Sequence, residues 1–478
     1  MGNKEAVNKR LAVRNARLVS ALTEGYDGDQ ADLLIEDGRI TGLFPVGHDF
    51  GSCDEIDAAG RTVLPGMLDL HTHLHFTKMD DLVLMSRKQN DVLLDCVDYA
   101  AELLRQGFTT VRDCGNPHYT AMAVRDGAER GLFRAPHILS CGYALAPTAP
   151  GNDDSTITVH ADTPEEVLKA GRQQIACGAD FLKYFGTGTV GSEHGVPGAL
   201  LTTKPELQAL NDTAEAYGKY AAVHCHSKAG ILLCAEVGIH TIEHASDIDD
   251  ECIERILSHG SHSAIIPTLG PIGLMRSGML GESIAKKVRE TSCEQQKMLE
   301  ASRVGVLTGW GTDVSLDYYS SNPGSEFLLR KERGWTAVEM LEQATINSAR
   351  IIGMADAITM QEFKKRNSRF NEQITSLQTQ TISLQQQEQQ KQIAATDTAA
   401  LEKALWADLN CKEPIQSEVV ATILDHAVVC EDSDDKQLHL ELYLRLGQTA
   451  SAYYERGKLA FKNASSKSTT PRRMTRRI

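Results

Sequence analysis

The chain has 478 residues, of which 41% are hydrophobic and 24% charged, so it can form one large folded domain with additional pieces. Its formal net charge of −15 argues against nucleic-acid binding by the chain as a whole. The 11 cysteines form no Cys-x-x-Cys pair, a pattern typical of free thiols in a reducing compartment. The N-terminus has no apolar signal core, and no apolar run approaches the roughly 20 residues of a membrane span. We therefore expect a cytoplasmic protein without a membrane partner.

Residues 1–62 read as half of a small β-domain. Two β-type runs between Ala31 and Phe44 are separated by Glu36-Asp37-Gly38, which predicts a hairpin. Helical periodicity is absent from this part of the chain.

Residues 63–356 change to short apolar runs that alternate with longer amphipathic segments, the pattern of βα units on a parallel sheet. Eight parallel strands close a (β/α)8 (TIM) barrel, whose chemistry lies at the C-terminal ends of the strands. The predicted fold class is therefore α/β. The eight candidate strands are 68–73, 109–113, 137–141, 180–184, 221–226, 241–244, 264–267 and 304–309.

Beyond Met354 the composition changes again. Residues 357–410 are Gln-rich, and Phe363, Phe370, Leu377 and Leu384 recur every seven residues, which predicts a coiled-coil helix. A flexible Gln-rich linker is the alternative. Residues 411–478 form a small tail segment, in which 439–446 alternate like a half-buried strand, and we expect the basic end, 471–478, to be disordered.

Metal-ligating residue types follow four of the candidate strands. His71 and His73 lie two apart at one strand end, so both imidazoles can face the same side and bind one ion. The pair His224 and His226 ends another strand, and His244 and Asp313 end two more. Divalent metals such as zinc favour this mixture of nitrogen and oxygen ligands.

Lys183 ends the strand 179–183 and would point toward this cationic site. A charged lysine would be repelled there, whereas reaction of the neutral amine with carbon dioxide gives a carbamate that can bridge two metals. The alternative is a surface lysine at a strand edge.

Residues 10–354 resemble the amidohydrolase superfamily, and within it the imidazolonepropionase-like and prolidase-like branch with a binuclear metal centre. The resemblance covers about three-quarters of the chain. The matching stretches are 65–73, 178–183, 223–226, 242–245, 311–313 and 344–353.

The resemblance implies roles for these residues around two divalent ions, with zinc as the expected metal. His71, His73 and Asp313 would hold one ion, His224 and His244 the other, and carboxylated Lys183 and a hydroxide would bridge them. His226, Tyr184, Arg112 and His194 are candidates for substrate binding. For Arg112 a structural ion pair with Asp113 is the alternative.

The implied reaction is hydrolysis of an amide or related C–N bond, with Asp313 as the proton shuttle. Small substrates of the dipeptide or N-acyl amino acid type come first. A lactonase- or esterase-type enzyme remains open, and so does a deaminase, although mononuclear deaminases generally lack the bridging lysine.

The resemblance stops after Met354, where the strands that normally complete the small β-sandwich are not visible, so we expect an incomplete sandwich with an exposed edge. The tail loosely resembles the coiled-coil end of large serine recombinases. An inactive barrel fused to an interaction tail is therefore the non-enzyme alternative, and nucleic acid stays open as a partner of the tail alone.

Removal of the residues after 360 tests the role of the tail. Every proposed ligand precedes residue 314, and a helix with an apolar seam needs a partner helix, so we expect a homo-oligomer. The truncated protein should keep its metal content but change its association state, measured by light scattering. An unchanged association state would contradict this role.

Overall fold

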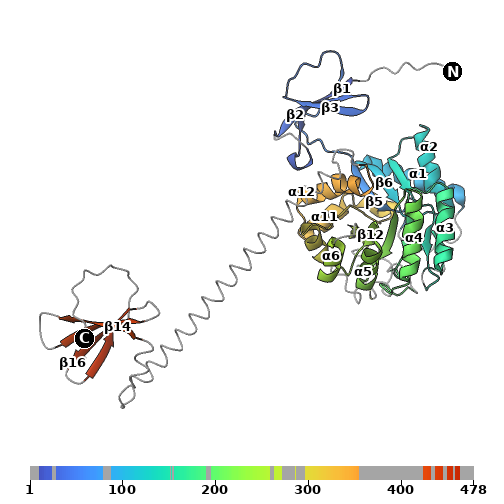
Figure 1. The fold of residues 1–478 in the computed structure, drawn as a ribbon. Coiled ribbons are helices and arrows are strands. Elements are labelled where there is room, and N and C mark those ends of the chain that lie inside the picture. The colour runs from blue at the N-terminus through green and yellow to red at the C-terminus, as the bar shows by residue number, and fades with distance from the viewer. Residues whose placement is uncertain are drawn as a thin grey trace. The chain divides into compact units, whose positions relative to one another are not determined.

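The computed structural model describes residues 10–23, 28–78, 88–150, 152, 155–189, 195–258, 263–271, 286 and 296–354, together with the backbone of four strands between 424 and 462. Contacts divide the chain into two units, Met1–Ala357 and Ile358–Ile478 (Figure 1). The predicted coiled coil, the basic end and His194 lie outside the described residues.

The N-terminal residues form one four-stranded sheet in the order β3-β2-β1-β4, with a short 3-10 helix after β1. The predicted hairpin is confirmed, because β2 and β3 pair antiparallel around Asp37 and Gly38. Both of these residues have positive φ, of 50° and 79°, as a tight two-residue hairpin turn requires. The elements are β1 (Arg10–Arg17), η1 (Ser20–Leu22), β2 (Gln30–Glu36), β3 (Arg39–Phe44) and β4 (Asp54–Asp57).

The edges of this sheet are β3 and β4. All four residues of β4 are exposed, and three of them are acidic. Charge on an exposed edge strand opposes pairing with another chain. Within residues 10–62 the structure therefore describes a single sheet with a charged edge.

Parallel strands that alternate with helices follow from residue 67 onward, so the prediction of an α/β domain is confirmed. β5, β6 and β7 pair in one sheet, and a second sheet has the order β13-β12-β11-β10-β8-β9. The strands are β5 (Met67–Thr72), β6 (Phe108–Asp113), β7 (His137–Ser140), β8 (Ala144–Ala146), β9 (Thr158–His160), β10 (Leu182–Phe185), β11 (Ala221–Cys225), β12 (Thr241–His244) and β13 (Ala264–Ile266).

Hydrogen bonds join the two sheets at both ends. On one side the amide of Asp180, just before β10, donates to the carbonyl of Ser140 at 2.8 Å. On the other side the segment 307–313 bridges β13 through Thr308 and Ile265, and the amide of Leu70 donates to the carbonyl of Trp310 at 2.8 Å. These links form a closed circuit through β5, β6, β7, β10, β11, β12, β13 and the segment 307–313.

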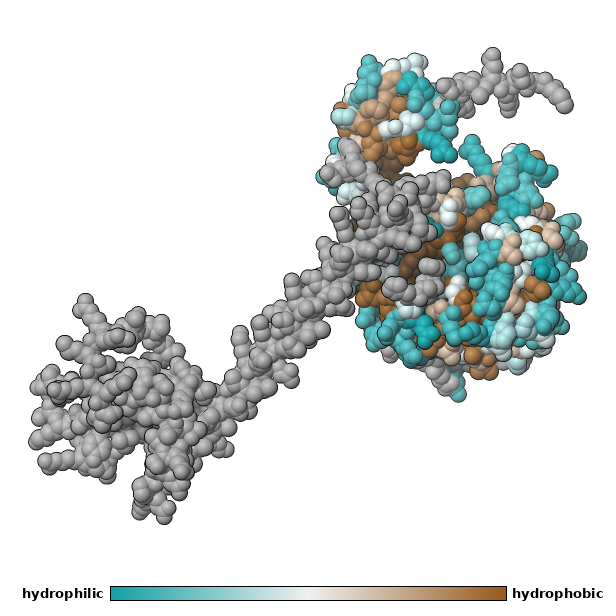
Figure 2. Space-filling view, viewed as in Figure 1, coloured by the Kyte–Doolittle hydropathy of each residue, from teal (hydrophilic) through white to brown (hydrophobic). Residues whose placement is uncertain are grey.

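Amphipathic helices pack on the outside of the strands (Figure 1). Leu103 and Leu210 are fully buried in one cluster with Val111 and Val223 of the strands. Hydrophilic residues cover much of α3 and α4 on the face in Figure 2, as this packing requires. The helices are α1 (Gln89–Arg105), η3 (Pro117–Tyr119), α2 (Thr120–Glu129), α3 (Pro164–Ala176), α4 (Lys204–Ala216), α5 (Lys228–Val237), α6 (Asp250–Leu257), α9 (Gln296–Arg303), α10 (Leu316–Ser321), α11 (Ser325–Glu332), α12 (Ala337–Glu342), η4 (Gln343–Asn347) and α13 (Ser348–Ile351).

The second unit contains a four-stranded antiparallel sheet in the order β14-β15-β16-β17. Its second strand includes most of 439–446, so the strand predicted there is confirmed. Among the described helices of the chain, none combines the length and the apolar composition of a membrane span. The strands are β14 (Leu424–Glu431), β15 (Gln437–Leu444), β16 (Thr449–Glu455) and β17 (Lys458–Lys462).

Candidate metal centre

The ends of β5, β11 and β12 bring five imidazoles together in one buried place. His71 lies on β5 and His73 directly after it, with their ring centroids 5.5 Å apart. The ring of His244, at the end of β12, lies 4.7 Å from that of His71. It thereby connects the β5 pair to His224 and His226.

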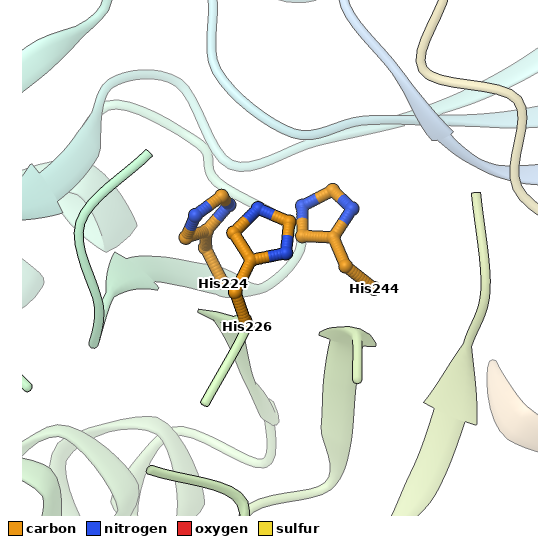
Figure 3. Close-up of side chains that lie close together, drawn as sticks. All are labelled: His224, His226 and His244. Carbon is orange, nitrogen blue, oxygen red and sulfur yellow. The ribbon is translucent and has the colours of Figure 1, made fainter. Parts of the chain in front are cut away.

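His224, His226 and His244 form a compact triangle (Figure 3). Their ring centroids are separated by 4.5 Å for His224 and both neighbours, and by 4.8 Å for His226 and His244. His224 and His244 occupy neighbouring strands whose parallel pairing sets Cys225 opposite His244. The triangle therefore follows from the register of β11 and β12.

Side chains and carbonyls from other segments hold the Nδ1 atoms of four of these imidazoles. The Nδ1 of His71 donates to Glu243 Oε2 at 2.6 Å, and that of His73 donates to the Gly115 carbonyl at 2.9 Å. A proton on Nδ1 leaves Nε2 with a free lone pair, which is what a metal ligand needs.

Hydroxyl groups hold the other two imidazoles. The Nδ1 of His244 lies 2.7 Å from Thr268 Oγ1, and the Nδ1 of His226 lies 2.8 Å from Ser246 Oγ. A hydroxyl can donate to Nδ1 or accept from it, so it can pair with either tautomer. The short contact then fixes the orientation of each ring. The hydroxyls therefore aim the Nε2 side of both rings away from themselves.

Asp313 ends the segment 307–313 and faces three of the imidazoles. Its Oδ1 lies 3.5 Å from His73 Nε2 and 3.8 Å from His71 Nε2, and its Oδ2 lies 4.0 Å from His244 Nδ1. The backbone at Asp313 has φ 55°, and its amide donates to the carbonyl of His71 at 2.9 Å. The carboxylate is thus held over the end of β5 by its own backbone.

Asp69 and Gly311 allow the approach of these two segments. The Asp69 carboxylate accepts from the Thr312 hydroxyl at 2.6 Å, from the Thr312 amide at 3.1 Å and from the His71 amide at 3.2 Å. A Cβ on Gly311 would lie only 2.8 Å from the Cβ of His71, so only glycine fits there.

Lys183 is fully buried at the same end of the strands. Its Nζ has no hydrogen-bond partner among the described residues and lies 4.4 Å from the centroid of the Phe185 ring. The Nε2 of His224 is also buried without a hydrogen-bond partner in that part of the chain. Two unsatisfied buried polar atoms on the neighbouring strands β10 and β11 point to a group that would normally complete them.

Burial keeps the imidazoles uncharged. Desolvation lowers the pKa of His73 and His226 to about 4, with the nearby Lys183 charge acting in the same direction. Desolvation, together with the charges of Lys183 and the neighbouring imidazoles, also lowers the pKa of the other three histidines well below the usual range. Desolvation raises the pKa of Asp313 to about 8. Neutral imidazoles keep the lone pair that a cation would bind, and a bound cation would favour the ionised form of Asp313.

The donor set fits divalent metal ions. Among the described residues, two of the three groups that could hold an ion are His71, His73 and Asp313, and His224, His226 and His244, each with ligand atoms within 4.8 Å of one another. Nitrogen donors with a carboxylate are the ligands of zinc and similar ions. The residues predicted from the strand ends are therefore brought together, and the unpartnered atoms of Lys183 and His224 lie at the same strand ends.

Arg112 is buried beneath the imidazoles. Its guanidinium donates to Glu243 Oε1 at 2.6 Å, to the Leu70 carbonyl at 2.6 Å and to Thr241 Oγ1 at 3.1 Å. The alternative of an ion pair with Asp113 is wrong, because the partner is Glu243. Consecutive residues of a strand point to opposite faces, so Arg112 and Asp113 face apart.

Tyr184 lies on the opposite face of β10 from Lys183. It is fully buried in the hydrophobic cluster with Leu182 of the same strand and with Leu207 and Leu210 of α4. The alternation of side chains along the strand places it between strand and helix. This placement gives no support to a contact with substrate.

Glu243, Thr268, Ser246 and Asp69 were not predicted for the site. A signal was present for two of them, because Glu243 and Asp69 are acidic residues inside apolar runs that end in histidines. Buried carboxylates need partners, which marks such positions. Thr268 and Ser246 carry no comparable signal, since their role depends on which ring lies beside them.

The sequence model of the Amidohydrolase family matches residues 62–358, which is more than half of the chain. The chain therefore belongs to this family, and it is a hydrolase.

Ochratoxinase from Aspergillus niger is 27% identical over 341 residues, covering 63% of this chain and 67% of that protein. An uncharacterised protein of Mycobacterium tuberculosis is 26% identical over 340 residues, covering 68% of this chain and 82% of its own length. A crystal structure of an amidohydrolase superposes with a TM-score of 0.64 at 28% identity, covering 73% of this chain and 88% of that one. The crystal structure of a prolidase complexed with N-methylphosphonate-L-proline superposes with a TM-score of 0.65 at 24% identity, covering 72% and 88%, which shows a shared fold.

Substitution of Glu243 by Gln tests the buried network below the imidazoles. The Glu243 carboxylate accepts from Arg112, from the Thr241 hydroxyl at 2.6 Å and from His71. A neutral amide cannot accept from all three, so the buried guanidinium loses its counter-charge. We expect a loss of about 3–5 kcal/mol in the free energy of unfolding, measured by urea denaturation. Glu36→Gln, in an exposed ion pair with Arg10, should cost at most about 1 kcal/mol. Equal losses in the two variants would contradict a special role for the Glu243 network.

Proposed function

We propose that this hydrolase is a binuclear metal enzyme that cleaves amide or related C–N bonds of small substrates, of the dipeptide or N-acyl amino acid type. The observation that carries the proposal is the pair of adjacent ligand groups with the unpartnered Lys183 amine at the same strand ends. The closed circuit of eight strand segments supports its interpretation as a (β/α)8 barrel, which carries its chemistry at these strand ends.

Within this proposal His71, His73 and Asp313 would hold one ion and His224 and His244 the other, and Lys183, as its carbamate, would supply a further oxygen ligand. Zinc is the expected metal, because imidazole and carboxylate are its usual ligands. Bound divalent ions would supply Lewis acidity and lower the pKa of water.

Asp313 moves the proton in the proposed reaction. Its carboxylate takes a proton from the attacking water and returns it to the nitrogen of the leaving amine. The position of the carboxylate suits this role, because the hydrogen bond from its own amide to His71 fixes it beside the imidazoles. Burial favours its protonated form once the proton has been taken up.

His226 orients the substrate in the proposed site. Ser246 holds its ring, and its amide donates to Thr187 Oγ1 at 3.0 Å, so the imidazole is fixed from two sides. A fixed neutral imidazole can hydrogen-bond a polar group of the substrate. The ochratoxinase relative agrees with a small organic substrate for this chain.

A deaminase is the second candidate, because a deaminase of 5-methylthioadenosine and S-adenosylhomocysteine from Desulforamulus reducens is 25% identical over 391 residues. The buried Lys183 favours the binuclear hydrolase, since a single-metal deaminase has no use for a bridging lysine. An ester or lactone substrate stays open for the same centre.

Metal analysis of the purified full-length chain, together with hydrolysis of a panel of dipeptides and N-acyl amino acids, tests the proposed function. We expect two divalent ions per chain and turnover of at least one amide. His71→Ala and His224→Ala should each abolish turnover because each removes a ligand. Leu94→Ala, at an exposed position of α1, is the control and should leave turnover unchanged. Full activity of both histidine variants would refute the site.

Lys183 tests the proposed bridge. Carbamate formation needs a neutral amine and dissolved carbon dioxide, so metal loading should improve when bicarbonate is present at mildly alkaline pH. Lys183→Ala should hold less metal, and short carboxylic acids should partly restore it by replacing the bridge. Two ions bound to Lys183→Ala, with no effect of bicarbonate on the wild type, would show that the lysine is no bridge.

A further inference from the structure

A buried ion pair on α11 clamps the loop that follows β13. Glu326 and Arg330 lie one helical turn apart, with Glu326 Oε1 at 2.9 Å from Arg330 Nε, and their side chains are at most 3% exposed. The loss of solvation by two buried charges can offset their attraction, so a buried ion pair adds little net stability. Its position therefore calls for another explanation. The groups around it supply one.

Each member of the pair holds the loop backbone on one side of Thr268. Glu326 Oε2 accepts from the amides of Leu269 at 3.0 Å and Gly270 at 3.1 Å, directly after Thr268. Arg330 Nη2 donates to the carbonyl of Pro267 at 2.8 Å, directly before Thr268. The pair thus fixes the peptide units on both sides of one residue.

Thr268 in turn holds a histidine of the centre. Its Oγ1 lies 2.7 Å from the Nδ1 of His244, and both residues are buried. His244 has φ 66°, a backbone conformation that residues with a side chain rarely adopt. Contacts from other segments must therefore hold the residue in this conformation. The hydroxyl is the contact that keeps the Nδ1 side of the ring turned away from His224 and His226.

Arg330 also reaches the segment that carries Asp313. Its Nη1 donates to the carbonyl of Gly309 at 3.3 Å, four residues before Asp313, and its guanidinium lies 4.3 Å from the ring centroid of Trp310. One guanidinium therefore contacts the loop after β13 and the segment 307–313 at once. These two segments contribute Thr268 and Asp313, whose oxygens lie 2.7 Å and 4.0 Å from the Nδ1 of His244.

We infer that Glu326 and Arg330 are positioning residues that hold the His244 ring in its metal-binding orientation through the backbone around Thr268. The inference rests on the proposed function, because it assigns a purpose to the orientation of a proposed ligand. Neither residue touches the imidazoles itself. Removal of such outer partners of a ligand typically weakens metal binding by about 10–100-fold.

Glu326→Gln is the sharpest variant. The carboxylate accepts from Arg330 with one oxygen and from two amides with the other. A glutamine has only one acceptor oxygen, and its amide NH₂ group can only donate. This NH₂ group must therefore face a donor, either Arg330 or the two loop amides. Thr268→Val removes the hydroxyl at constant shape, and Thr268→Ser keeps it.

Co²⁺ binding to the metal-free protein measures the effect, with the visible Co²⁺ spectrum as a readout of ligand geometry. We expect Glu326→Gln and Thr268→Val each to weaken Co²⁺ binding about tenfold and to change the spectrum. Thr268→Ser should resemble the wild type. The double variant, with Glu326→Gln and Thr268→Val, should bind Co²⁺ as tightly as the single variant that binds it more weakly. Both changes act through the same contact between Thr268 and His244.

Glu339→Gln is the matched control. Its carboxylate forms an exposed ion pair with Arg303 at 2.8 Å and also accepts from the Thr336 amide at the start of α12, so its loss should lower the free energy of unfolding without changing Co²⁺ binding. Unchanged Co²⁺ binding in Glu326→Gln, or a double variant whose loss is the product of both single losses, would overturn the inference. If Glu326→Gln does not fold, Arg330→Lys takes its place, since one ammonium cannot reach both Pro267 and Gly309.

Imidazole ¹⁵N NMR of the metal-free protein separates this inference from the proposed function. The His244 signals should shift in Glu326→Gln and in Thr268→Val but stay in place in Glu339→Gln. Unshifted His244 signals in Glu326→Gln would overturn the inference even in an active enzyme. A wild type that holds metal but hydrolyses no amide would refute the proposed function alone.

Discussion

Five imidazoles can share one buried place only if they carry no charge. Charged rings at centroid separations of 4.5–5.5 Å would repel each other in a region without water. Desolvation and the neighbouring imidazoles lower the pKa of His71, His224 and His244, which expresses this constraint. The same neutrality leaves lone pairs free, so the packing that excludes water also prepares the rings to bind cations. The other features of the site support this arrangement.

Neutral rings still need an orientation, and other segments provide it. Glu243 holds His71 from β12, Gly115 holds His73 from the segment after β6, and Thr268 holds His244 from the loop after β13. Because four of the five rings are held from a neighbouring strand or loop, their orientation depends on the closed circuit of strands. The fold therefore sets the orientation of the imidazole lone pairs through these Nδ1 contacts.

Three of the eight described residues other than glycine that have positive φ lie at the same strand ends. His244, Ala245 and Asp313 all have positive φ values, between 49° and 66°. Such conformations cost about 1–3 kcal/mol each for residues other than glycine and persist where surrounding contacts hold them. Here the hydrogen bond from the Asp313 amide to His71 and the contact of His244 with Thr268 are those contacts. Without these conformations the side chains would continue the alternation of the strand. The positive φ values turn them toward a common centre instead.

The sequence by itself determined the alternation of strands and helices and the residues that end the strands. An apolar run followed by His71 and His73 specifies both a buried strand and a polar end, because side chains alternate along a strand. The unexpected polarity of Lys183 inside an apolar strand likewise marked a buried amine, which the structure describes.

Only the tertiary structure decided which groups meet across strands. An ion pair with Asp113 was the alternative to substrate binding for Arg112, which instead pairs with Glu243, 131 residues away, because neighbours on a strand face apart. Tyr184 was expected near the site but packs under a helix for the same reason. Thr268 gains its role from the ring beside it, which no local pattern encodes. Contacts of this kind depend on the register between strands, and register is fixed only when the whole circuit packs.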